Sequence, residues 1–126
     1  MKSSRLPVLA FLMLAVLLLP SCGFKRKLVS ITITPDKATL GGPGLDLQLK
    51  AVGNYIHPPD SRDLTDTVTW ESAAPQVVTV DAHGLATSGV ACGTDITITA
   101  TAHSDPHDSG SGLVIGTAAI TVTCPQ

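Results

Sequence analysis

Alternation of apolar and polar residues in short segments is the feature that most restricts how this chain can fold. Residues 28–34 carry Ile31 and Ile33 on one side, and residues 45–51 carry leucines at positions 45, 47 and 49 on one side. Successive side chains of a β-strand point to opposite faces, so a period of two residues predicts strands with one buried side. Further segments that we interpret as strands are residues 67–71, 78–80, 85–87, 95–102 and 113–124.

Turn-forming sequences separate these segments. Gly41–Gly44 and Asp81–Gly84 are rich in the residues that favour tight turns. We expect residues 53–66 to form a long connection and residues 103–112 to form a polar loop. About seven short strands divided by turns predict an all-β fold, an antiparallel sandwich of two sheets.

The composition supports this fold class and argues against binding of nucleic acid. Only 14% of the residues are charged, with Glu71 as the single glutamate, which favours strands and turns over helices. Residues 1–21 are interpreted as a removable export segment. Without Lys2 and Arg5, six basic residues stand against ten acidic ones, a net charge of −4. No basic patch is therefore expected for nucleic acid, and the remaining length suits one domain.

The N-terminus resembles the signal peptide of a bacterial lipoprotein. Residues 6–20 carry no charge, and this run is shorter than the roughly 20 residues of a bilayer-spanning helix. It ends in Leu19-Pro20-Ser21-Cys22, which resembles the bacterial lipobox. The resemblance implies that the Cys22 thiol is lipidated and that the chain is cut before it. The alternative is an ordinary signal peptide that happens to precede a cysteine.

Residues 22–27 are expected to join the lipid to the domain as a short basic tether. Lys25, Arg26 and Lys27 either contact anionic headgroups or lie in solvent. The five residues after Cys22 span at most about 17 Å, so the domain should lie close to its membrane. The resemblance implies the bacterial cell envelope, and Gly23 directly after the cysteine favours the outer membrane if the cell is Gram-negative.

Several motifs follow one another in a recognisable order: Val29–Pro35, Leu45–Leu49, Val68–Ser72, Val77–Asp81, Gly84-Leu85 and Gly93–Ala100. Together they resemble the bacterial immunoglobulin-like group 2 domain, familiar from intimin- and invasin-type adhesins. The resemblance covers residues 28–124. It implies an immunoglobulin-like sandwich that serves adhesion, binding or structural roles and is not an enzyme. This chain departs from the family pattern in its long 53–66 and 103–112 segments and in an added pair of cysteines.

Cys92 and Cys124 are predicted to form a disulfide, because exported proteins meet oxidising conditions. The two cysteines lie at the start of the penultimate strand and at the end of the last one, so a hairpin would bring them together. Two free buried thiols are the alternative. The register that pairs the cysteines also gives the pairs Ile96–Ile120 and Ile98–Ala118, with the connecting loop centred on Asp108.

No motif predicts catalysis, and we expect neither a cofactor nor a resident metal. Ser109–Gly112 lacks the spacing of a nucleophile elbow and is typical of a linker. Asp60, Asp63 and Asp66 offer oxygens to calcium but lack the glycine turn and the glutamate of a calcium loop. The polar loop also holds possible metal ligands, but Pro106 excludes the helical spacing that would make them specific. These ligands are His103, Asp105, His107 and Asp108.

Two aromatic positions have opposite interpretations. Trp70 shares the side of Val68, so we expect it to be buried between the two sheets. Tyr55, Ile56 and His57 precede two prolines and form a possible contact loop, or a turn made rigid by those prolines.

Two classes of function remain. The first is a non-catalytic envelope lipoprotein, held in the membrane by its lipid, whose domain binds a protein or glycan partner or acts as a structural accessory. The second is a small lipoprotein that binds a metal or another ligand through the loop aspartates and histidines.

Overall fold

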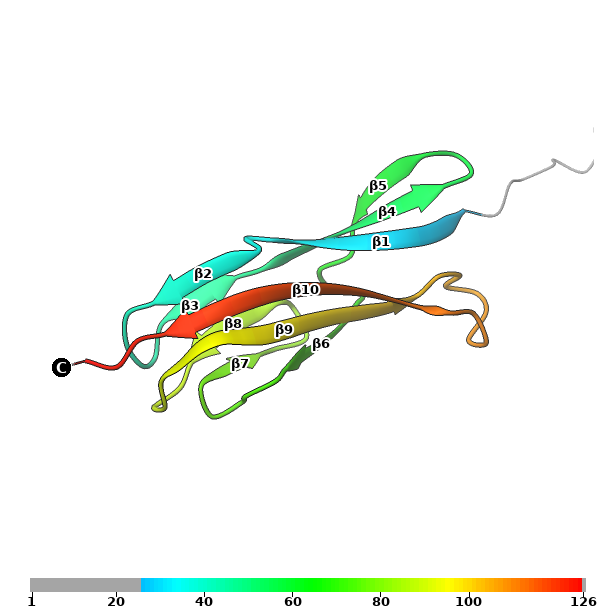
Figure 1. Ribbon diagram of the computed structural model, residues 1–126. Coiled ribbons are helices and arrows are strands. Elements are labelled where there is room, and N and C mark those ends of the chain that lie inside the picture. The colour runs from blue at the N-terminus through cyan, green and yellow to red at the C-terminus, as the bar shows by residue number, and fades with distance from the viewer. Residues whose placement is uncertain (1–25, 126) are drawn as a thin grey trace, which may run out of the picture.

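The computed structural model describes residues 26–125, which contain ten strands and no helix (Figure 1). The all-β prediction is confirmed. The strands are β1 (Lys27–Thr34), β2 (Lys37–Leu40), β3 (Asp46–Gln48), β4 (Lys50–Ile56), β5 (Asp60–Asp63), β6 (Thr69–Ser72), β7 (Val78–Val80), β8 (Leu85–Ser88), β9 (Gly93–His103) and β10 (Leu113–Val122).

The strands form two layers (Figure 1). One layer contains β2, β10, β9 and β6 in that order, and the other combines the sheets β1-β4-β5 and β3-β8-β7. The last two sheets are continuous through Leu49, which alone separates β3 from β4 and whose backbone N–H donates to the Gly84 carbonyl at 2.9 Å. Every pair is antiparallel except β2 with β10, which is parallel.

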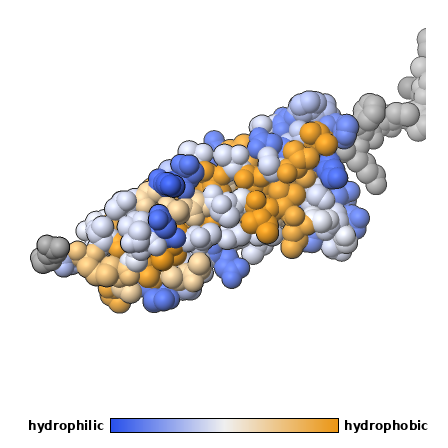
Figure 2. All heavy atoms as spheres, viewed as in Figure 1, coloured by the Kyte–Doolittle hydropathy of each residue, from blue (hydrophilic) through white to orange (hydrophobic). Residues whose placement is uncertain are grey.

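Inward-facing side chains of both layers form one core. Leu49, Ile98 and Ile120 are fully buried, and they come from the segments whose alternation is clearest in the sequence. Gly116 lets β10 approach β1 closely, because a Cβ at this position would lie 2.6 Å from the Ile31 carbonyl oxygen. Large apolar side chains also remain at the surface, and Figure 2 shows hydrophobic residues in the half of the molecule where β1 begins and again at the opposite end.

The predicted register of the last hairpin is confirmed. Ile96 lies opposite Ile120 and Ile98 opposite Ala118. The register changes nearer the cysteines, because Gly93 pairs with Val122. Two residues of β9 there oppose the single residue Thr121, a β-bulge. Asp95 lies in the bulge with a φ of 52°, and its backbone N–H donates to Thr121 Oγ1 at 3.0 Å.

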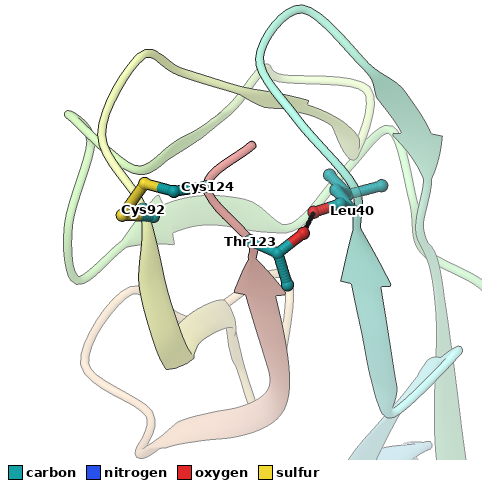
Figure 3. Close-up of a disulfide and its surroundings, with 4 residues drawn as sticks. All are labelled: Leu40, Cys92, Thr123 and Cys124. Atoms are coloured by element: carbon teal, nitrogen blue, oxygen red, sulfur yellow. Dashed lines mark hydrogen bonds between the residues drawn. A yellow bond between two sulfur atoms is a disulfide. The ribbon is translucent and has the colours of Figure 1, made fainter. Parts of the chain in front are cut away.

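The predicted disulfide between Cys92 and Cys124 is present, with 5.3 Å between the two Cα atoms (Figure 3). The neighbouring Thr123 binds the adjacent strand on the other side. Its backbone N–H donates to the Leu40 carbonyl at 2.9 Å, and its hydroxyl lies 3.4 Å from the same oxygen. The end of the last strand is therefore attached covalently to the start of β9 and by hydrogen bonds to β2.

The structure corrects three expectations. Residues 53–66 are not a plain connection, because they contain the end of β4 and all of β5. Leu45 does not face the core and is 44% exposed. Trp70 is half-buried at the margin of the core rather than enclosed between the sheets, since its ring lies against Gly84 and its Nε1–H donates to the Thr65 carbonyl at 2.8 Å.

Candidate contact surfaces

The predicted contact loop forms the tip of the β4–β5 hairpin. Tyr55 and Ile56 belong to β4 and are half-buried, while His57, Pro58 and Pro59 form the exposed turn. His57 has a φ of 63°, in the left-handed region that few residues other than glycine adopt. Ile56, His57 and the two prolines line an open, apolar hollow of about 470 Å³. The tip thus presents a small apolar surface that two prolines hold in shape.

A second hollow lies beside the tip. It has a volume of about 410 Å³ and reaches from Leu28 and Tyr55 to Leu113. Partial burial raises the pKa of the Tyr55 phenol, and the nearby Asp60 carboxylate raises it further, while Arg26 lowers it. Tyr55 therefore stays neutral at physiological pH and contributes its ring and a hydroxyl to this hollow.

Charged residues at the base of the tip pair with one another. Asp60 lies 3.0 Å from Arg62 Nε and 3.5 Å from the Arg26 guanidinium. All three side chains are more than a third exposed, so each pair contributes little to stability. The pairs nevertheless place Arg26, the first described residue, against the start of β5.

The loop aspartates that we considered for calcium do not converge. Asp63 accepts hydrogen bonds from the hydroxyl and the backbone N–H of Thr65, and these two bonds lower the pKa of its carboxyl. Asp66 instead lies 2.9 Å from His83 Nδ1, and this contact raises the pKa of the imidazole. Within residues 26–125, no group of three or more His, Cys, Asp or Glu side chains is placed to hold a metal ion.

The 103–112 loop uses its polar residues to hold its own shape. Asp105 accepts a hydrogen bond from the His107 N–H, and Asp108 accepts one from the Gly110 N–H. The Ser111 hydroxyl accepts from the Asp105 N–H at 3.1 Å and donates to the Asp105 carbonyl at 3.2 Å. These contacts agree with the interpretation of Ser109–Gly112 as part of a linker rather than as a catalytic motif.

A surface that sequence reasoning missed is the outer face of the β2-β10-β9-β6 sheet. The outward positions of its four strands are dominated by threonine, and paired strands place these threonines next to one another, as in Thr69–Thr101 and Thr99–Thr117. Neighbouring strands lie about 4.8 Å apart, so the side chains of each pair lie close together. Other pairs on this face join a threonine to a different residue, as in Thr97–Ala119 and Thr101–Ile115. The threonines of this face, which we call the threonine face, are Thr39, Thr69, Thr97, Thr99, Thr101, Thr117 and Thr121.

Cys22, the predicted lipidation site, lies outside the described residues, as does the export segment. In the part of the chain that the structure describes, no helix is long and apolar enough to cross a bilayer. The lipid anchor thus stays a prediction from the sequence.

Comparison with known proteins identifies the domain. The sequence profile of a family described as bacterial Ig-like domain (group 2) matches residues 28–112, from the second residue of β1 to the end of the loop before β10. A similar curated protein is Ice-binding protein 1 of Shewanella frigidimarina (strain NCIMB 400), with 47% identity over 78 residues. The alignment covers 62% of this chain and only 8% of that relative, so the likeness concerns one small part of a much longer protein.

Proposed function

Because the chain belongs to the group 2 family of bacterial Ig-like domains, we propose that it is a non-catalytic lipoprotein of the bacterial envelope whose domain mediates binding or adhesion. The observation that carries the proposal is the position of Cys22. This cysteine follows an apolar run and a small residue. A short basic segment connects it to the Ig-like domain. A diacylglycerol with a further acyl chain would anchor the domain stably, because two or more chains suffice for lasting membrane attachment.

The anchor is tested by expressing the full chain with Cys22→Ala and with the control Ser21→Ala, which keeps a small residue before the cysteine. We expect the unsubstituted chain and Ser21→Ala to partition into detergent and to incorporate labelled palmitate. Cys22→Ala should lose both properties, because it lacks the thiol that carries the lipid. Equal partitioning and labelling of all three proteins would refute the lipoprotein proposal.

We assign partner binding to the threonine face. The face points to solvent and carries the charges of Lys37 and Glu71 on its two edge strands. Its hydroxyl groups can both donate and accept hydrogen bonds. A protein strand or a glycan can use such groups without the cost of burying unpaired charges.

Site-specific crosslinking on intact cells tests this assignment. A photoreactive residue at Thr99 should capture an envelope protein or glycan, because Thr99 lies between Glu71 and Thr117 on the face. The matched control is Thr79, an exposed threonine on β7 in the other layer. Capture from Thr79 with none from Thr99 would place the binding surface elsewhere.

Similarity to part of an ice-binding protein favours ice as a second candidate ligand of the threonine face. Evenly spaced hydroxyl and methyl groups can hold water in an ordered layer, and Thr97, Thr99 and Thr101 repeat at every second residue of β9 on this face. If ice is the ligand, the full chain should slow ice recrystallisation and Thr99→Lys should abolish the effect, whereas Thr79→Lys should not. Absence of any effect from the unsubstituted chain would exclude this candidate.

A further inference from the structure

Three segments meet at the end of the domain where β1 begins (Figure 1). Lys27 pairs with Ile56 across β1 and β4, which places the β4–β5 tip beside the first residue of β1. The Leu28 N–H donates to the Ser104 carbonyl at 2.9 Å, so the 103–112 loop adjoins the same point. The contact tip therefore lies at the end of the domain from which the chain continues toward Cys22.

The length of the tether limits how far this end can lie from the membrane. Four residue steps separate Cys22 from Arg26, and a fully extended chain advances at most about 3.6 Å per step, or about 14 Å in all. Arg26 in turn lies against Asp60, directly after the tip. If Cys22 is lipidated, as proposed above, the tip must lie near the bilayer surface.

The same end carries exposed apolar groups. Pro58 and Pro59 are exposed beside Ile56, and Val29 and Leu113 are 46% and 60% exposed. Figure 2 shows one group of hydrophobic residues in the half of the molecule toward this end and a second group at the opposite end. The prolines have fixed φ angles, so the tip would lose little conformational entropy on contact with another surface.

We propose that this end of the domain docks onto the bilayer that holds the Cys22 lipid, with Ile56, Pro58 and Pro59 at the boundary between headgroups and acyl chains. Apolar side chains in that position gain from leaving water, as in other interfacial anchors. Arg26, Lys27 and Arg62 are opposed there by Asp60 and Asp63, so attraction to anionic lipid is secondary. The inference rests on the proposed anchor, and it gives the domain a fixed orientation with the disulfide end outward.

Quenching of tryptophan fluorescence by brominated lipid tests the docking. The lipidated full chain is reconstituted in phosphatidylcholine vesicles, with tryptophan introduced at the tip as Ile56→Trp or, in a second protein, as Pro59→Trp. Val90→Trp is the control, because Val90 is 94% exposed and lies in the segment next to Cys92 at the opposite end. The unsubstituted chain supplies the background signal of Trp70.

We expect brominated acyl chains to reduce the added fluorescence of either tip variant at least about twofold, and to leave that of Val90→Trp unchanged. Flotation of each protein with the vesicles is measured on the same samples. Proteins that float but show equal quenching at the tip and at position 90 would overturn the docking and leave the anchor standing. Proteins that neither carry lipid at Cys22 nor float would overturn both.

Discussion

At the scale of single residues, Gly84 and Gly116 hold positions that no larger residue can take without displacement of its neighbours. Gly84 has a φ of 76° and lies against Leu49 and Trp70, so it serves both the turn and the packing of the indole ring. Gly116 lies in a strand of regular conformation, and its role is close approach alone. The sequence predicts the turn at Gly84 from its neighbours, but the need for glycine at 116 depends on which strand faces it.

Gly116→Ala should lower the free energy of unfolding by about 1–3 kcal/mol, the usual range for overpacking a core. The added methyl group would lie 2.6 Å from the Ile31 carbonyl oxygen and 2.8 Å from Ile31 Cγ2. Gly112→Ala is the control, because nothing lies within 4 Å of a Cβ there, and its effect should stay below about 1 kcal/mol. Urea denaturation measures both, and equal effects would contradict the close approach of β10 to β1.

Asp81 should make the stability of the domain depend on pH in acid. Its carboxylate accepts hydrogen bonds from the Leu85 N–H and from the His83 N–H, which hold the pKa of the carboxyl below its ordinary value of 3.8. The ionised group therefore stabilises the fold above pH 3.8, and this contribution is lost as the pH falls through the lower folded-state pKa.

Asp81→Asn keeps an oxygen that accepts both hydrogen bonds but cannot ionise, whereas Asp81→Ala removes the acceptor. We expect Asp81→Ala to melt at a lower temperature than the unsubstituted chain at pH 7, and both variants to lose part of the acid dependence below pH 4. Thermal unfolding at a series of pH values measures this. An Asp81→Ala variant with an unchanged melting temperature and acid dependence would show that the turn does not rely on this carboxylate.

At the scale of elements, the strands in which apolar and polar residues alternate clearly were predictable. The strands that are defined only by their pairing with a neighbour were not. The β9–β10 register followed from Ile96, Ile98 and their partners, since a slip of one residue would turn apolar groups to solvent. β5 escaped prediction because Asp60–Asp63 contains no apolar residue and lies at the edge of its sheet, where charge is favoured. The threonine face was also missed, because strand order decides which threonines become neighbours.

Replacement of both Cys92 and Cys124 by alanine should cost about 2–4 kcal/mol of stability without changing the fold, because the cross-link acts mainly by restricting the unfolded chain. Circular dichroism of the double variant should match that of the oxidised protein at 20 °C, and urea denaturation should give a lower midpoint. A reduced protein that loses its strand signal under native conditions would mean that the disulfide is needed for the fold itself.

At the scale of the whole molecule, the two ends of the sandwich differ in chemistry. One end holds the start of β1, the apolar β4–β5 tip and the 103–112 loop, and the other holds the disulfide. The threonine face runs along the side between them. This arrangement suits a domain that stands close to a membrane and presents a side surface to a partner. The sequence predicted the all-β fold, but the position of the tip beside the start of β1 follows only from the pairing of β1 with β4.

The claim that an exported, lipid-anchored Ig-like domain is closed by a disulfide is tested most directly by peptide mass spectrometry of the non-reduced protein from cell envelopes. No Lys or Arg follows Arg62, so trypsin leaves Cys92 and Cys124 together in the peptide that begins at Asp63. We predict an N-terminal peptide that begins at Cys22 with a diacylglyceryl group, and a C-terminal peptide two hydrogens lighter than after reduction. A mature chain that begins elsewhere without lipid, or a C-terminal peptide with two free thiols, would contradict it.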